Sequence, residues 1–216
     1  MKVKKVKKKL KKKNAPIIKY TSLNGWSFKK DHVNTWAWAK NVFSPEECQK
    51  IIDIGNSLNP TGGRIQGEKN IETTNDTIRK SLVSWVGPNQ NTNWIFIRLQ
   101  KIVEKLNNDF FKFHITGINE GLQFTKYKAP GGHYDKHFDK MWDGVIRKLS
   151  LTIQLTDPSK YEGGDLEIFQ SHEPLKMEKE QGMAILFPSY VLHGVTPITK
   201  GVRYSLVGWF TGDPFK

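Results

Sequence analysis

Hydrophobic and polar residues follow a helical period in two segments of the N-terminal half. Ser44-Pro45-Glu46-Glu47 form a capping box with proline at the first helical position, which predicts a helix over residues 45–58. A second helix is predicted over residues 91–111, with Trp94, Ile97, Ile102 and Leu106 on its buried face. The glycine-rich polar segment 59–76 lies between them, and we expect it to be a long mobile loop of the kind that serves as a lid.

The pattern changes after about residue 113 to short alternating segments, which are typical of strands. Strands are also expected in residues 14–43 and at 82–86. Helices followed by many short antiparallel strands favour an α+β, mainly β fold: a double-stranded β-helix (jelly roll) braced by N-terminal helices. The main run of strands is expected at 121–127, 148–156, 165–169, 182–187 and 202–210.

The 216 residues suit one domain with a full core. We expect a disordered lysine-rich tail at 1–15 and a single domain at 16–216, which divides into a helical brace with its N-terminal segment (16–112) and a jelly-roll core (113–212). The net charge is +13, but nine lysines fall within the first thirteen residues, so the rest carries +4. The functional interpretations of such a block are contact with nucleic acid, attraction to an acidic partner or adhesion to an anionic surface, and the alternative is a solvated tail that aids solubility.

Cysteine content and hydropathy limit the cellular compartments in which the protein is expected. Cys48 is the one cysteine, so an internal disulfide and a four-cysteine zinc site are excluded, and we expect Cys48 to be a buried small hydrophobe. No apolar run reaches the length of a membrane span, and the basic start lacks the apolar core of a secretory signal. The expected location is therefore the reducing cytoplasm.

Residues 127–139 contain two overlapping His-x-Asp pairs, His133/Asp135 and His137/Asp139. Residues i and i+2 of a strand point to the same side, so either pair can offer an imidazole and a carboxylate to one cation. Two histidines and one carboxylate form a facial triad that binds iron(II) and leaves coordination positions open. His193 is the best downstream candidate for the third ligand. Spacing alone leaves the choice between the two pairs open.

Arg203 lies ten residues after His193, across the predicted turn at 199–201. The two side chains can therefore face each other from paired strands inside a barrel. A guanidinium buried there needs an anionic partner and is suited to bidentate capture of a carboxylate. A metal with open positions next to a carboxylate anchor indicates a dicarboxylate co-substrate bound at both ends.

Several motifs now carry a family resemblance. They are Tyr127, the Gly131-x-x-Tyr134-x-x-His137-x-Asp139 segment, the Tyr161-Glu162-Gly163-Gly164 turn, and the stretch from His193 through Arg203 and Ser205. In this order they resemble 2-oxoglutarate- and iron(II)-dependent dioxygenases of the prolyl 4-hydroxylase-like, PKHD-type hydroxylase family. The resemblance covers roughly residues 75–211.

The resemblance implies a role for each of these residues. It selects His137, Asp139 and His193 as the iron ligands, and it pairs Arg203 with the distal carboxylate of 2-oxoglutarate, with Tyr127 and Ser205 as helpers. Tyr127 lies one residue farther from the iron histidine than in the commonest family spacing. Its contact with 2-oxoglutarate therefore requires a bulge near Ala129-Pro130 that absorbs the extra residue. Ascorbate is implied as a reductant.

The implied reaction uses 2-oxoglutarate and O₂ to hydroxylate an unactivated C–H bond, releasing succinate and CO₂, with a prolyl residue of a peptide or protein as the favoured substrate. Arg79, Tyr134 and Trp142 are candidates for substrate contact, and Gln123 and Thr125 for lining the same pocket. The alternatives are an oxygenase acting on a small metabolite or nucleic acid, and a non-catalytic jelly-roll binding module targeted by its basic tail.

Overall fold

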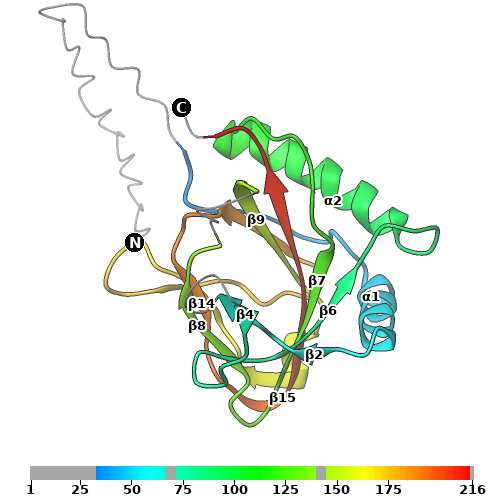
Figure 1. Cartoon of the computed structure of the whole chain (residues 1–216), viewed down its shortest axis with the longest axis vertical. Coiled ribbons are helices and arrows are strands. Elements are labelled where there is room, and N and C mark those ends of the chain that lie inside the picture. Colours follow the sequence, from blue (N-terminus) through cyan, green and yellow to red (C-terminus); the bar gives the residue numbers. More distant parts are fainter. Residues whose placement is uncertain (1–32, 67–71, 140–144, 215–216) are drawn as a thin grey trace, which may run out of the picture. The chain divides into compact units, whose positions relative to one another are not determined.

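The computed structural model describes residues 33–66, 72–139 and 145–214. It confirms a strand-rich fold with few helices (Figure 1). The predicted lysine-rich tail, most of the N-terminal segment 14–43 and Trp142 lie outside the described residues. Among the described helices, none is both long and apolar enough to cross a membrane.

Two antiparallel sheets form the body of the domain. In the larger sheet the order is β1-β13-β9-β15-β7-β6-β2, and β10 also pairs with β15. Its strands are β1 (Ala37–Ala39), β2 (Thr61–Gly62), β6 (Leu82–Val86), β7 (Leu122–Lys128), β9 (Arg147–Gln154), β10 (Tyr161–Gly163), β13 (Ala184–Pro188) and β15 (Ile198–Thr211).

The smaller sheet has the order β12-β11-β14-β8-β5. Its strands are β5 (Arg79–Lys80), β8 (His133–His137), β11 (Leu166–Ile168), β12 (Leu175–Lys176) and β14 (His193–Val195), and β3 (Ile65–Gln66) pairs separately with β4 (Glu72–Thr73). The expected loop 59–76 was therefore wrong in part, because it contains β2, β3 and β4. Strands β1, β2, β5 and β6 also come from before residue 113, so the segment expected to act as a brace contributes to the sheets.

Both predicted helices form, and they pack on the outer face of the larger sheet (Figure 1). Helix α1 (Pro45–Ser57) begins with the predicted capping box, in which Ser44 Oγ accepts from Glu47 N–H. Helix α2 (Asn93–Leu106) continues as the π-helical turn η2 (Asn107–Phe111). Its predicted buried face was wrong in part: Leu106 is buried and Trp94 and Ile102 are half-buried against the core, but Ile97 is exposed. The other buried residues are Ile95, Leu99 and Val103.

The apolar core lies in two layers. One layer fills the space between the helices and the larger sheet, where Ile51, Leu99 and Phe124 are fully buried and Cys48 is buried as predicted. The other layer includes Tyr127, Tyr161 and Phe187. The 3-10 turn η3 (Pro158–Lys160) leads into β10. A polar cavity opens beside the second layer, between the strands of the two sheets, and it holds the predicted site residues.

Candidate active site

Strand pairing in the smaller sheet brings His137 and His193 side by side. Strands β8 and β14 are antiparallel, and in their register His137 lies directly opposite His193. Their ring centroids are 4.2 Å apart. Asp139 follows β8 by two residues, and its backbone N–H donates to the Ser189 carbonyl at 3.0 Å, which fixes where the carboxylate leaves the chain.

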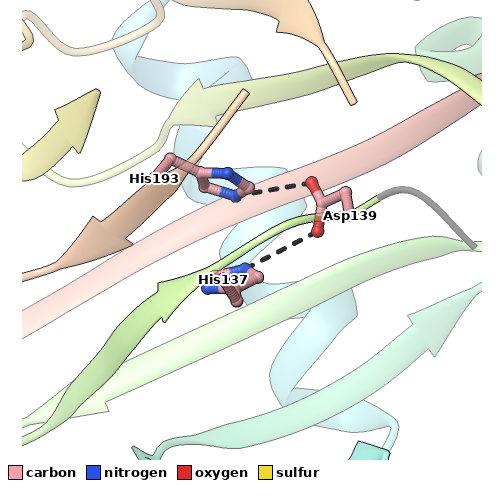
Figure 2. A group of neighbouring side chains, drawn as sticks. All are labelled: His137, Asp139 and His193. Carbon is pink, nitrogen blue, oxygen red and sulfur yellow. Dashed lines mark ion pairs between the residues drawn. The ribbon is translucent and has the colours of Figure 1, made fainter. Parts of the chain in front are cut away.

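The three side chains converge on one point (Figure 2). Nε2 of His137 lies 3.6 Å from Oδ1 of Asp139, and Nε2 of His193 lies 3.4 Å from Oδ2. Nδ1 of His137 contacts the Asp135 carbonyl at 2.7 Å, and Nδ1 of His193 contacts the Val191 carbonyl at 2.9 Å. A carbonyl only accepts, so each Nδ1 carries the proton, and each Nε2 keeps a free lone pair directed at the convergence point.

Burial and charge set the protonation states that a metal requires. Burial lowers the pKa of the His193 imidazole to about 4, against a partial opposing effect of the Asp139 carboxylate, so His193 is neutral at pH 7. Burial alone would raise the pKa of the Asp139 carboxyl, but the neighbouring His193 and His137 outweigh it and hold that pKa well below its usual range. A neutral imidazole and an ionised carboxylate are the ligand forms of these groups.

The second His-x-Asp pair has a different environment. Nδ1 of His133 contacts the Gly131 carbonyl at 2.8 Å, and its Nε2 contacts the Thr77 carbonyl at 3.1 Å. Asp135 is exposed. Both ring nitrogens of His133 lie within hydrogen-bond distance of backbone carbonyls, and neither His133 nor Asp135 joins the cluster of His137, Asp139 and His193.

The cluster lies in the wall of a cavity of about 690 Å³. The predicted co-substrate residues Arg203, Tyr127 and Ser205 line the same cavity. In the register of β15 and β7, Arg203 lies opposite Tyr127, and its guanidinium carbon is 5.5 Å from the centre of the Tyr127 ring. Strand β7 ends at Lys128 and pairs with β15 in an unbroken register, so Ala129 and Pro130 lie in the turn to β8 and not in a bulge of the strand.

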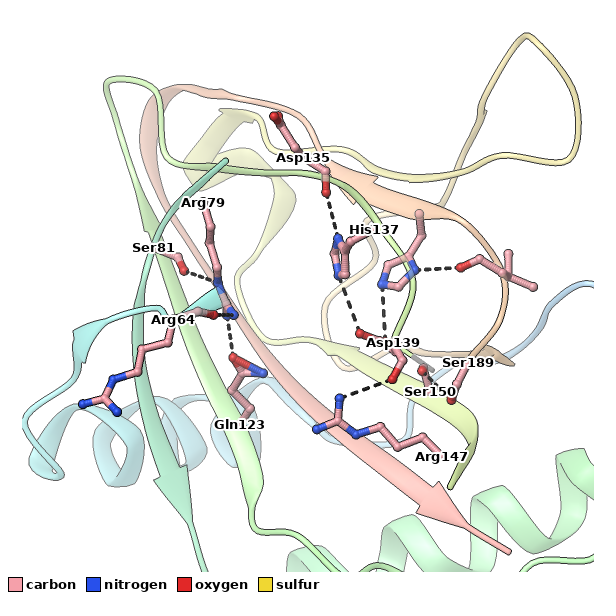
Figure 3. Close-up of polar contacts among 12 residues, drawn as sticks. Arg64, Arg79, Ser81, Gln123, Asp135, His137, Asp139, Arg147, Ser150 and Ser189 are labelled. Atoms are coloured by element: carbon pink, nitrogen blue, oxygen red, sulfur yellow. Dashed lines mark hydrogen bonds and ion pairs between the residues drawn. The ribbon is translucent and has the colours of Figure 1, made fainter. Parts of the chain in front are cut away.

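The predicted substrate residues Arg79 and Tyr134 also line this cavity, as do Gln123 and Thr125. The Tyr134 ring stacks on His137 at 3.6 Å, and the Arg79 guanidinium lies 4.4 Å from the centre of the Tyr134 ring. The same guanidinium donates to Gln123 Oε1 (Figure 3). The Arg79 side chain is also held by Ser81 Oγ at 2.9 Å and by the Arg64 carbonyl at 3.2 Å.

Sequence reasoning missed two groups around the cluster. Arg147 Nη1 donates to the Asp139 carbonyl at 3.4 Å (Figure 3). The same side chain makes a bidentate ion pair with Glu120, and its guanidinium lies 3.9 Å from the centre of the Trp209 ring. Gln154 contacts Arg203. The Gln154 contact had a signal, since Ser150, Thr152 and Gln154 alternate as polar residues along a predicted strand, but nothing in the sequence linked Glu120 to Arg147.

The donor set fits iron(II). Two imidazole nitrogens and one carboxylate within 4.8 Å of one another match the facial arrangement that this metal prefers. The cavity also fits an anion beside the metal, because Arg203 is 1% exposed and its Nη1 is a buried donor without a hydrogen-bond partner.

Comparison with known proteins agrees with this geometry. Residues 122–211 match the family model of the 2OG-Fe(II) oxygenase superfamily. A PKHD-type hydroxylase from Prochlorococcus marinus is 40% identical over 90 residues, which is 41% of this chain and 40% of that protein. The chain spans about half the length of the curated relatives it matches, from 39% to 55% in five of them.

Solved structures share the fold at low sequence identity. A prolyl hydroxylase from Trichoplax adhaerens, in complex with a hypoxia inducible factor peptide fragment, has a TM-score of 0.67 and 19% identity over 83% of this chain and 84% of its own. The viral collagen prolyl hydroxylase of Paramecium Bursaria Chlorella virus-1, as its 2OG complex, has a TM-score of 0.61 and 21% identity over 84% and 97%.

Proposed function

Since residues 122–211 match the family model of the 2OG-Fe(II) oxygenase superfamily, we propose that the protein is an iron(II)- and 2-oxoglutarate-dependent dioxygenase. The observation that carries the proposal is the convergence of His137, Asp139 and His193 on one point in the wall of a cavity that also contains the buried Arg203. The proposed reaction hydroxylates an unactivated C–H bond and releases succinate and CO₂.

His137 and His193 would hold iron(II) through Nε2, and Asp139 through its carboxylate. When bound, the iron and 2-oxoglutarate together activate O₂ and supply the oxidant for the C–H bond. The chain's own contribution is positional. The carbonyls of Asp135 and Val191 fix both imidazole tautomers, and Ser189 and Arg147 hold the Asp139 backbone from two sides. These contacts keep three ligands in place before the metal arrives.

Arg203 would pair with the distal carboxylate of 2-oxoglutarate, with Tyr127 and Ser205 as neighbours in the same wall. The guanidinium is almost fully buried, so its interaction with a carboxylate is little screened by water. Arg203 therefore fixes one end of the co-substrate, and the three metal ligands fix the other. Ascorbate would serve as a reductant and would not take part in the contact between Arg203 and 2-oxoglutarate.

The substrate that we propose is a prolyl residue of a peptide or protein. Two observations support it: curated relatives are named PKHD-type hydroxylases, and one structural neighbour is a prolyl hydroxylase with a peptide fragment bound. Arg79 and Tyr134 line the cavity near His137 and are the proposed substrate contacts, with Trp142, which lies outside the described residues. We place this reaction in the cytoplasm, where the lone Cys48 stays reduced.

A small-metabolite substrate and the non-catalytic binding module remain the alternatives that experiment must exclude. A nucleic-acid partner has no support in the comparisons, and the lysine-rich segment that motivated it lies outside the described residues. Turnover of proline-rich peptides, compared with methylated single-stranded DNA and free amino acids, separates the substrate classes.

The first test is anaerobic addition of iron(II) and 2-oxoglutarate to the purified protein. We expect a visible metal-to-ligand charge-transfer band, which weakens at fixed 2-oxoglutarate in Arg203→Ala because the distal carboxylate loses its partner. Lys200→Ala is the matched control, since Lys200 lies on the same strand but is exposed and pairs with Glu162. Folded wild-type protein that binds iron but gives no band would overturn the dioxygenase proposal in favour of the binding module.

A further inference from the structure

The Arg203 guanidinium is held by a neutral partner. Oε1 of Gln154 accepts from Arg203 Nε at 3.2 Å and from Nη2 at 2.9 Å, and both side chains are at least 98% buried. This Nε–Nη2 edge is one that a carboxylate could otherwise occupy with two parallel hydrogen bonds. Among the residues that the structure describes, no carboxylate pairs with Arg203.

The backbone holds Gln154 rigidly in this place. It is the last residue of β9 and lies opposite Ser205, so it is a diagonal neighbour of Arg203 on the adjacent strand. Its N–H donates to the Met183 carbonyl at 3.0 Å, and its carbonyl accepts from Gly182 N–H at 2.7 Å. With both backbone groups bonded, the side chain approaches Arg203 from a fixed origin.

The other side of the guanidinium has polar atoms but no partner. Arg203 Nη1 and the Tyr161 hydroxyl are both buried without a hydrogen bond. The Tyr161 hydroxyl lies near Arg203: burial raises the pKa of this phenol, and the charge of Arg203 and a weak hydrogen-bonding interaction with it partly oppose the rise. Gly164 packs against the arginine stem, since a Cβ there would lie 3.1 Å from Arg203 Cδ, and its φ of +60° also favours glycine. The stem is therefore confined, while Nη1 stays available.

We propose that Gln154 is a positioning residue whose neutral side chain lets Arg203 select a 2-oxo acid with a second, distal carboxylate. It positions Arg203 by the Nε–Nη2 edge and, because it is uncharged, leaves the full positive charge for the ligand, which is received at the Nη1 end. This inference rests on the proposed function. It adds that selectivity depends on a neutral residue at position 154.

The decisive variant is Gln154→Glu, which keeps the shape of the side chain and adds one negative charge. A glutamate beside a buried guanidinium is ionised at pH 7.5, because the opposite charge favours that form. The variant thus supplies an internal carboxylate to Arg203 and removes the net charge that a distal carboxylate requires. The interaction of the ligand's 2-oxo acid end with the metal is unaffected.

The measurement is calorimetric titration of the Mn(II)-loaded protein with 2-oxoglutarate and with 2-oxopentanoate, which replaces the distal carboxylate by a methyl group. We expect wild type to bind 2-oxoglutarate at least about tenfold more tightly, as for a close buried charge pair. Gln154→Glu should lose at least about tenfold in 2-oxoglutarate affinity and stay within about threefold for 2-oxopentanoate.

A matched control introduces the same charge elsewhere in the cavity. Gln123 Oε1 accepts from Arg79 Nη2 at 2.5 Å. Gln123 lies on β7 four residues before Tyr127, the residue that is paired with Arg203, so it is near the other end of that strand. Gln123→Glu should therefore retain the preference for 2-oxoglutarate. If it loses that preference as Gln154→Glu does, the effect is general cavity charge, and the proposal is wrong.

The remaining outcomes are separable. Unchanged 2-oxoglutarate affinity in Gln154→Glu overturns the proposal, and so does an equal loss for both ligands, which would indicate a purely structural role. If thermal melting shows that Gln154→Glu does not fold, Gln154→Met takes its place. Methionine adds no charge but cannot accept from Arg203, so this variant should bind 2-oxoglutarate more weakly and still prefer it to 2-oxopentanoate. Loss of that preference overturns the proposal. Failure of wild type to bind either 2-oxo acid tells against the proposed function instead.

Discussion

Two chemically identical His-x-Asp pairs lie four residues apart in this chain, and their surroundings give them different properties. His137 has one ring nitrogen against a backbone carbonyl and the other directed at Asp139, whereas both ring nitrogens of His133 lie next to backbone carbonyls. Asp139 is buried between two imidazoles, whereas Asp135 is exposed. A metal ligand needs a free lone pair and a nearby second ligand, and these come from the strand opposite, not from the motif itself.

The carboxylates of the two pairs give a direct test. We expect Asp139→Asn to abolish the rise in melting temperature that Mn(II) produces, and to abolish 2-oxoglutarate decarboxylation, because the amide removes the anionic ligand. Asp135→Asn makes the same chemical change four residues earlier and should keep both. The measurements are differential scanning fluorimetry with and without Mn(II), and succinate release. Equal loss in both variants would contradict the assignment of His137, Asp139 and His193 as the metal site.

At the scale of elements, helix α1 depends on a close approach to the larger sheet. A methyl group added at Gly55 would lie 2.2 Å from Cγ of Phe124, a ring with no exposed surface that stacks on Tyr204. Gly55→Ala should therefore lower the free energy of unfolding by about 1–3 kcal/mol, as overpacking does, despite alanine's higher helix propensity.

The control for this change is Gly87→Ala, since a Cβ at Gly87 would meet no atom within 4 Å. It should alter the free energy of unfolding by less than about 0.5 kcal/mol, the usual range for a surface change. Urea unfolding of both variants measures the difference. Gly55→Ala as stable as wild type would show that α1 can move away from β7 without cost.

Elements with strong local signals were predicted from the sequence. The capping box gave the start of α1 within a residue, and the alternating segments gave β6, β7, β9 and β15. The buried face of α2 was misassigned in part. Trp94 and Ile97 suggested an apolar face that included both residues, whereas packing against the sheet buries Ile95 and Leu99 and leaves Ile97 exposed. The two-residue strands β2, β3, β4 and β5 have no periodicity to detect, since they exist only through their partners.

The candidate site was predictable to a similar degree and for the same reason. His137, Asp139, His193 and Arg203 lie in motifs with recognisable spacing, and the structure brings them to one cavity. Gln154 and Glu120 act through partners that are 49 and 27 residues away in the chain, Arg203 and Arg147. Such pairs follow from strand register, which a single sequence does not specify.

At the scale of the whole molecule, the two sheets bury a titratable cluster, and this makes stability depend on pH. The folded state holds the pKa of His193 at about 4, against about 6.5 in an unfolded chain. Between these values the unfolded chain binds a proton that the folded protein does not, so the metal-free protein should lose stability as pH falls from about 6.5 to 4. The low pKa of the Asp139 carboxyl extends the loss to more acidic pH.

The lowering of the His193 pKa corresponds to roughly 3 kcal/mol of the free energy of unfolding, which is a large part of the stability of a typical domain. Urea unfolding of metal-free protein at pH 7.5, 6 and 5 should show the decline, and His193→Gln should flatten it because glutamine does not titrate. His172→Gln should leave the decline intact, since His172 is almost fully exposed. An unchanged slope in His193→Gln would mean that the acid sensitivity arises elsewhere, and that burial of the cluster costs the protein little when the metal is absent.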